Sequence, residues 1–162
     1  MRGRNGLVVI LALVMIFTLA PAALAADYSD TADHWANTQI EKWSAAGILK
    51  GDDGKFRPSD PITRGELAII IDRIMDYQVI ARNSFTDLPA GAYFTWPILR
   101  ANAAGVILGD AGLVRPKDYI IREEAAVMLG RAFGLEALNS GSLHFLDKKD
   151  IAPWASSMVL AM

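Results

Sequence analysis

The strongest constraint on the fold is an internal repeat, in which the segment Gly51–Glu66 returns as Gly109–Glu124. When residues 40–73 are aligned with residues 98–131, 15 of the 34 positions are identical. The matches include a Gly-Asp turn, an Arg-Pro pair and an Arg-x-Glu sequence, each in register. A sequence that returns at a fixed period predicts a repeated supersecondary unit whose copies pack against one another.

The segment from Met1 to Ala25 has the pattern of a secretory signal peptide. Met1–Asn5 contains two arginines, residues 6–20 are predominantly apolar, and an Ala-x-Ala sequence ends at Ala25. The apolar run is short for a membrane span of about 20 residues, so an uncleaved anchor is the weaker interpretation. We therefore expect cleavage after Ala25, export of the protein, and no membrane span in the mature chain.

The composition of the mature chain excludes several classes of function. Without Arg2 and Arg4, residues 26–162 carry 14 Lys and Arg against 18 Asp and Glu, with no cysteine. This mild acidity does not provide the basic surface that nucleic-acid binding needs, and no disulfide or thiol chemistry is available. His34 and His144 lack zinc-site spacing, and the Asp52–Gly54 turn lacks the acidic residues of a calcium loop. We therefore expect neither a metal site nor a cofactor.

Each copy is predicted to fold as helix, loop, helix, which makes the chain all-α. In the first copy, Trp35, Ile40 and Trp43 fall on one side of a first helix, and the glycines of Gly51–Gly54 permit a sharp turn. The apolar residues of the second helix recur with helical spacing: Leu67, Ile70, Ile71, Ile74 and Met75.

The starts of the two second helices differ in sequence. Thr63 and Glu66 have the spacing of a capping box, in which each side chain binds the other's backbone N–H. In the second copy Ile121 stands in place of the threonine, so we expect a softer helix start there, by about 1 kcal/mol.

The repeat also sets the expected domains. We place the first copy with its linker at residues 26–84, the second at 85–144, and a partial third copy at 145–162. The third copy opens at Phe145 and reaches Met162 before any further Gly-x-x-Gly turn or Arg-x-Glu motif. A half copy leaves apolar helix faces uncovered, which predicts self-association.

The ordered motifs resemble those of the S-layer homology family of secreted bacterial cell-surface proteins, with two complete modules and a truncated third. The first copy supplies Tyr28-Ser29-Asp30, His34-Trp35-Ala36, Gly47-Ile48-Leu49, Gly51-Asp52-Asp53-Gly54, Phe56-Arg57-Pro58 and Thr63-Arg64-Gly65-Glu66. The second copy supplies Phe85-Thr86-Asp87, Gly105-Val106, Gly109-Asp110-Ala111-Gly112, Arg115-Pro116 and Arg122-Glu123-Glu124.

This resemblance implies tandem helix-loop-helix modules arranged as an incomplete pseudo-threefold helical prism. It also implies a secreted protein held non-covalently at the cell wall, without enzymatic activity. The implied partner is a secondary cell-wall polysaccharide, often pyruvylated, or peptidoglycan. Two other functions stay open: a self-assembly module of a surface layer, and a glycan hydrolase that uses a carboxylate pair such as Asp52 and Glu66.

The resemblance further implies a set of glycan-binding residues. Arg64 and Arg122 match the family's groove arginine, and an arginine at a helix start can hold a carboxylate through its own donors and through free backbone N–H groups. The other candidates lie in the turns and at the first helix: Gly51, Asp52, Gly109, Asp110 and Trp35.

Several of these residues have a structural alternative. Arg64 could instead pair with Glu66 or Asp60, and we assign Glu66 mainly to capping. Trp35 and Trp154 open amphipathic helices, which favours a core position over a sugar platform. Arg57 and Arg115, each beside a proline, are expected to brace their loops.

Overall fold

The computed structural model describes residues 28–162, and the predicted signal peptide lies outside the described residues. The chain divides into two compact units, one up to Pro58 and the other from Ser59 to Met162. Within residues 28–162 the regular elements are all helical, with only isolated β-bridges, so the all-α prediction is confirmed. None of the described helices combines the length and apolarity needed to cross a bilayer. The prism stays a prediction.

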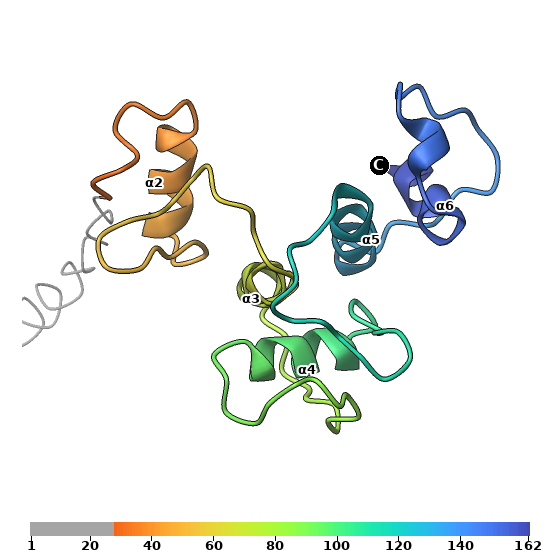
Figure 1. The fold of residues 1–162 in the computed structure, drawn as a ribbon, viewed down its shortest axis with the longest axis horizontal. Helices are drawn as coiled ribbons and strands as arrows, with labels where there is room; N and C mark the ends of the chain where they lie inside the picture. Colours follow the sequence, from red (N-terminus) through yellow and green to blue (C-terminus); the bar gives the residue numbers. More distant parts are fainter. Residues whose placement is uncertain (1–27) are drawn as a thin grey trace, which may run out of the picture. The chain divides into compact units, whose positions relative to one another are not determined.

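The helices recur with the period of the sequence repeat (Figure 1). The first helices of the three copies have nine residues each and begin at equivalent positions of the repeat: α2 (Asn37–Ala45), α4 (Thr95–Ala103) and α6 (Pro153–Ala161). The second helices, α3 (Arg64–Met75) and α5 (Arg122–Ala132), also begin at equivalent positions. A short 3-10 turn, η1 (Lys148–Asp150), precedes α6.

In the first unit, the aromatic-x-Asp segment holds the loop that follows α2. The Tyr28 hydroxyl accepts the backbone N–H of Gly51 at 2.9 Å. The Asp30 carboxylate accepts the N–H groups of Phe56 and Arg57 at 2.8 and 2.7 Å. The hydrogen bond from Phe56, followed by that from Arg57, lowers the pKa of Asp30. The motif therefore has a structural purpose, because its carboxylate fixes the backbone around Arg57.

The second unit repeats this arrangement with other side chains. Asp87 accepts the N–H groups of Val114 and Arg115 at 2.9 and 2.6 Å. The Phe85 ring lies so close to Gly109 that a Cβ there would come within 2.5 Å of it. Both loops therefore rest on an aspartate from the start of the copy and on a glycine beneath an aromatic ring.

The helix starts agree with the sequence-based expectation. Thr63 Oγ1 accepts the N–H of Glu66 at 3.3 Å, and Glu66 Oε2 accepts the N–H of Thr63 at 2.8 Å. The capping box at α3 is therefore complete. At α5, Glu124 accepts the N–H of Ile121 at 3.4 Å, but Ile121 has no side-chain acceptor to offer in return. Only half of the box is present there.

In the second unit, helices pair across the boundaries of the sequence repeat. The second helix of one copy packs against the first helix of the next: α3 against α4, and α5 against α6, while α3 also contacts α5. The largest fully buried side chains among the described residues are Ile71, Ile98, Val106 and Val114. The repeat in the sequence is thus not the packing unit, because the second copy supplies one helix, α4, to the first pair and the other, α5, to the second.

The two helix pairs use different chemistry at equivalent positions. In the first pair, Arg100 Nε donates to Asp72 Oδ1 at 2.8 Å, with the Asp72 side chain 8% exposed and that of Arg100 27% exposed. The hydrogen bond to Asp72 raises the pKa of Arg100. The equivalent residues of the next copy are Gly130 and Met158, and a Cβ on Gly130 would lie 2.3 Å from the Met158 sulfur. An ion pair and a close apolar contact therefore occupy the same site.

The unequal burial of Asp72 and Arg100 predicts unequal effects when one or the other partner of the ion pair is removed. We expect Arg100→Met to lower the free energy of unfolding by about 3 kcal/mol, because it leaves the buried Asp72 charge unpaired. Asp72→Ala should cost only about 1–2 kcal/mol, because Arg100 can extend into water. The double variant Asp72→Gly, Arg100→Met, which copies the second pair, should recover part of the loss in urea denaturation. Equal losses for both single variants would contradict this interpretation.

Candidate functional site

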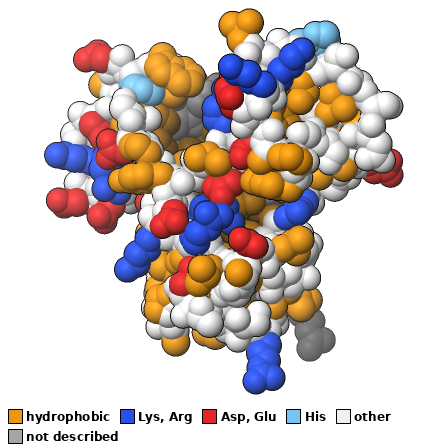
Figure 2. All heavy atoms as spheres, turned by 45° about the vertical axis from the view of Figure 1, so that its right-hand side comes forward, with side chains coloured by type: hydrophobic (Ala, Val, Ile, Leu, Met, Phe, Trp, Pro, Cys, Tyr) orange, Lys and Arg blue, Asp and Glu red, His pale blue; other side chains and the backbone are white. Residues whose placement is uncertain are grey.

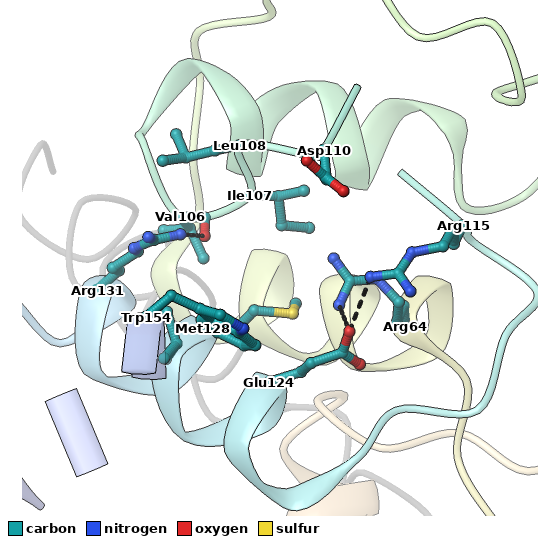
Figure 3. Close-up of a pocket in the computed structure, with 12 residues that line it drawn as sticks. Arg64, Val106, Ile107, Leu108, Asp110, Arg115, Glu124, Met128, Arg131 and Trp154 are labelled. Atoms are coloured by element: carbon teal, nitrogen blue, oxygen red, sulfur yellow. Dashed lines mark hydrogen bonds and ion pairs between the residues drawn. The ribbon is translucent and has the colours of Figure 1, made fainter. Parts of the chain in front are cut away.

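A cavity of about 450 Å³ lies within the second unit. Its walls come from the start of α3, from α5, from the loop between α4 and α5, and from the first turn of α6 (Figure 3). The lining residues are Arg64, Val106, Ile107, Leu108, Gly109, Asp110, Arg115, Glu124, Val127, Met128, Arg131 and Trp154. All three copies of the repeat therefore contribute to one cavity of a size suited to a small ligand.

One end of the cavity is organised around the Glu124 carboxylate. Its Oε1 atom lies 3.1 Å from Arg64 Nη1 and 2.9 Å from Arg115 Nη2, and the Glu124 side chain is 10% exposed. Figure 3 shows both guanidinium groups turned towards this oxygen, with Asp110 on the same side of the cavity. Two guanidinium groups therefore converge on one carboxylate, and Asp110 adds a second negative charge, so the formal charges at this end balance (Figure 3).

Arg64 is held on several sides. Its side chain is 11% exposed, and besides the pairing with Glu124 its Nε donates to the Val114 carbonyl at 3.0 Å. The sequence left pairing with Glu66 or Asp60 open, but the partner in the structure is Glu124, which belongs to the next copy of the repeat.

The N-terminus of α3 offers no free donors. The N–H groups of Arg64 and Gly65 bind the carbonyls of Asp118 and Pro116, at 3.0 and 2.9 Å. The next two N–H groups bind the side chain and carbonyl of Thr63. The expectation that free backbone N–H groups at this helix start would help to hold an anion is therefore wrong. Gly65 allows this approach, because a Cβ there would lie 2.9 Å from the Pro116 oxygen.

Arg115 differs from Arg64 in exposure and in backbone geometry. Its side chain is 46% exposed, and its φ of 51° lies in the left-handed region, which costs a residue other than glycine about 1 kcal/mol or more. Ala111 has a φ of 47° within its turn, so the angle alone identifies no function. What distinguishes Arg115 is that its strained backbone carries a half-exposed cation into the cavity.

The other end of the cavity is largely apolar. Trp154 and Met128 lie there together, and Arg131 Nη1 donates to the Val106 carbonyl at 3.4 Å (Figure 3). Trp154 is 56% exposed, so the preference for a core position was wrong for this residue. Trp154 is the second residue of α6, and its ring forms a wall of the cavity. The buried residue of that helix is instead its neighbour Ala155.

The cavity brings together three of the residues predicted from the sequence, namely Arg64, Gly109 and Asp110. Asp110 also forms a tight turn, in which its N–H donates to the Leu113 carbonyl at 2.9 Å. Gly109 packs beneath Phe85, which explains this glycine without a ligand.

The other four predicted residues lie elsewhere. Gly51 and Asp52 occupy the equivalent turn of the first unit, where a Cβ on Gly51 would lie 2.6 Å from the Tyr28 ring. Trp35 precedes α2 and is 90% exposed, so its preferred assignment to the core was wrong. Arg122 does not line the cavity; its side chain is 85% exposed and pairs with Asp147 at 3.3 Å.

Sequence reasoning missed Arg115, Glu124 and Arg131 as parts of the cavity. A signal for them existed, because all three are identical to their equivalents in the first copy: Arg57, Glu66 and Arg73. Arg115 was expected to brace its loop and no role was expected for Glu124, yet both line the cavity. Among the described residues, no group of three or more His, Asp or Glu is arranged to hold a metal ion.

The pairing of Arg64 predicts a loss of stability on its removal. We expect Arg64→Ala to lower the free energy of unfolding by about 2 kcal/mol, because the Val114 carbonyl loses its donor and Glu124 loses one of two cations. Urea denaturation monitored by tryptophan fluorescence measures this change. A loss below about 0.5 kcal/mol, as is usual for a surface substitution, would show that Arg64 does not brace the second unit.

The sequence comparisons identify the family. The S-layer homology domain model matches residues 27–68 and 84–126, which together make up just over half of the chain. An exoglucanase of Acetivibrio thermocellus is 33% identical over 138 residues, which is 82% of this chain and 13% of that protein. A surface-layer 125 kDa protein of Lysinibacillus sphaericus is 29% identical over 90% of this chain and 13% of its own length.

An S-layer protein of Bacillus anthracis is 32% identical over 68% of this chain and 14% of its own length. The chain thus spans only about a seventh of the length of each of these relatives. Surface-layer proteins recur among them, which is in keeping with a location at the cell surface. The chain belongs to the S-layer homology domain family.

Proposed function

We propose that this chain anchors a secreted protein non-covalently to the bacterial cell wall, by binding an acidic cell-wall polysaccharide in the cavity of the second unit. Anchoring at the cell surface is supported by the family and by relatives named as surface-layer and S-layer proteins. The observation that carries the choice of ligand is the pair of guanidinium groups that share the single carboxylate of Glu124.

The charges of the cavity favour an anion despite the acidity of the whole chain. The lining residues include three arginines against Asp110 and Glu124, whereas the whole chain has a formal net charge of −2. The attraction is therefore local and works through directed donors rather than bulk charge. A guanidinium group suits this purpose because it offers a fork of donors that matches a carboxylate and does not lose its proton.

The remaining walls suit a sugar. Asp110 provides oxygens that can accept hydrogen bonds from hydroxyl groups. Trp154 provides a half-exposed ring against which the apolar face of a pyranose can pack. A pyruvyl ketal on the sugar would supply the carboxylate, and we include it in the proposal because of the family resemblance.

We propose that the chain itself is not an enzyme. Glu66, half of the carboxylate pair considered for a hydrolase, uses Oε2 to bind both the N–H and the hydroxyl of Thr63 at 2.8 Å. The relatives named as enzymes share only a small part of their length with this chain, for example 13% of the exoglucanase and 7% of an amylopullulanase of Thermoanaerobacterium thermosulfurigenes. Catalysis in those proteins can therefore belong to other domains.

Sedimentation with purified sacculi tests the proposal. We expect the mature protein to bind sacculi of at least one of Acetivibrio thermocellus, Thermoanaerobacterium thermosulfurigenes and Lysinibacillus sphaericus, and to lose binding once the polysaccharide is extracted. A half-maximal concentration in the micromolar range is expected for a site of this size.

The other outcomes separate the alternatives. Binding that survives extraction would assign the ligand to peptidoglycan, and release of sugar fragments would identify a hydrolase. Failure to bind any of the three kinds of sacculi, with sedimentation of the protein alone as a self-associated species, would contradict the anchor and favour self-assembly.

A further inference from the structure

We infer that Arg115, rather than Arg64, is the residue that binds the acidic group of the ligand. In the absence of the ligand, Arg115 is paired with Glu124. The inference rests on the proposed function, because it concerns the same cavity and the same acidic polysaccharide. It differs from the assignment that the sequence favours, in which the arginine at the start of α3 is the ligand residue.

The two arginines are not equally available. Arg64 is 11% exposed and donates from Nε to the Val114 carbonyl while Nη1 lies against Glu124. Turning it towards a ligand would leave a backbone carbonyl without its donor, which is unfavourable in a buried position. Arg115 is 46% exposed, and the only side-chain interaction found for it among the described residues is its contact with Glu124. Its guanidinium group can therefore turn outwards with the loss of a single ion pair, the one with Glu124.

Glu124 tolerates the departure of Arg115. After that departure its Oε1 still faces Arg64 Nη1 at 3.1 Å, and its Oε2 still accepts the N–H of Ile121 at 3.4 Å. No buried charge is left unpaired, so the step avoids the large penalty for an isolated carboxylate. The carboxylate of the ligand replaces that of Glu124 as the partner of Arg115, and the number of ion pairs is conserved. This exchange explains why two guanidinium groups converge on one oxygen atom.

The backbone of Arg115 is held by hydrogen bonds, whereas its side chain is half-exposed. Asp87 accepts the N–H groups of Val114 and Arg115 at 2.9 and 2.6 Å, which secures the left-handed φ of 51°. Glycine would adopt this φ without strain, yet an arginine stands here and also at Arg57, where φ is 57°. Non-glycine residues persist in such conformations when the surrounding structure determines them, and they concentrate at functional sites. A fixed backbone that carries a half-exposed cation is the arrangement that gripping a ligand requires.

The experiment uses Arg115→Gly in the mature protein. Glycine removes the guanidinium group but fits the backbone angle, so the relief of strain offsets the loss of the ion pair with Glu124. The matched control is Arg82→Ala, which removes one positive charge from an exposed residue of the same unit that does not line the cavity. Binding is measured by calorimetry with polysaccharide extracted from the sacculi that the wild-type protein binds, before and after reduction of its carboxyl groups to alcohols.

We expect Arg115→Gly to weaken binding to the intact polysaccharide about tenfold to a hundredfold, as for the loss of a charge-assisted hydrogen bond. Its unfolding midpoint should stay close to that of the wild-type protein. Arg82→Ala should bind like the wild-type protein. On the carboxyl-reduced polysaccharide the wild-type protein and Arg115→Gly should bind equally weakly, because the partner of Arg115 is gone.

Two results would overturn this assignment of Arg115 without contradicting the proposed anchoring function. One is a folded Arg115→Gly variant that binds the intact polysaccharide as tightly as the wild-type protein. The other is an equal loss for Arg115→Gly on intact and reduced polysaccharide, which would assign Arg115 to a structural role. If the wild-type protein itself binds no sacculi, the proposed function fails, and this outcome is distinct from either of the other two.

Discussion

The second unit depends on one carboxylate oxygen. Glu124 Oε1 receives Arg64 from the start of α3 and Arg115 from the loop that precedes α5, while the other oxygen of the same group accepts the N–H of Ile121. The side chain thus connects the start of α5, a neighbouring helix and a loop, and its 10% exposure keeps solvent from weakening these interactions. The same residue caps a helix, joins two copies of the repeat and sets the charge of the cavity.

Duplication of a sequence does not require duplication of its chemistry. The loops of the two units keep the same aspartate, with Asp30 and Asp87 each binding two consecutive N–H groups. The two helix pairs use helices at equivalent positions of the repeat but a different contact, since the Asp72–Arg100 ion pair gives way to Gly130 against Met158. What has to be preserved is the placement of the backbone, and either an ion pair or a close apolar contact can maintain it. Many apolar side chains also lie exposed among charged ones on the face drawn in Figure 2.

Most of the fold could be predicted from the sequence because its signals are local. The period of the repeat, the capping box of Thr63 and Glu66, and the missing cap at Ile121 all reappear in the structure. The site was harder, because its residues meet through packing across the repeat boundary. Nothing near Arg64 in the sequence points to Glu124, and no local pattern shows that the donors at the start of α3 are already bound to the Asp118 and Pro116 carbonyls. Trp35 and Trp154 were assigned to the core because they open amphipathic helices, but Trp35 precedes α2, Trp154 lies in the first turn of α6, and both side chains are exposed.

The most direct test of the account follows the arginine side chains individually. Nitrogen-15 NMR spectra of the guanidinium groups, recorded during titration with the acidic polysaccharide, report which arginine changes its partner. The account predicts that the Arg115 resonances move in proportion to the bound fraction, while the Nε–H resonance of Arg64, held by the Val114 carbonyl, stays in place. Movement of the Arg64 resonance together with an unchanged Arg115 would contradict it.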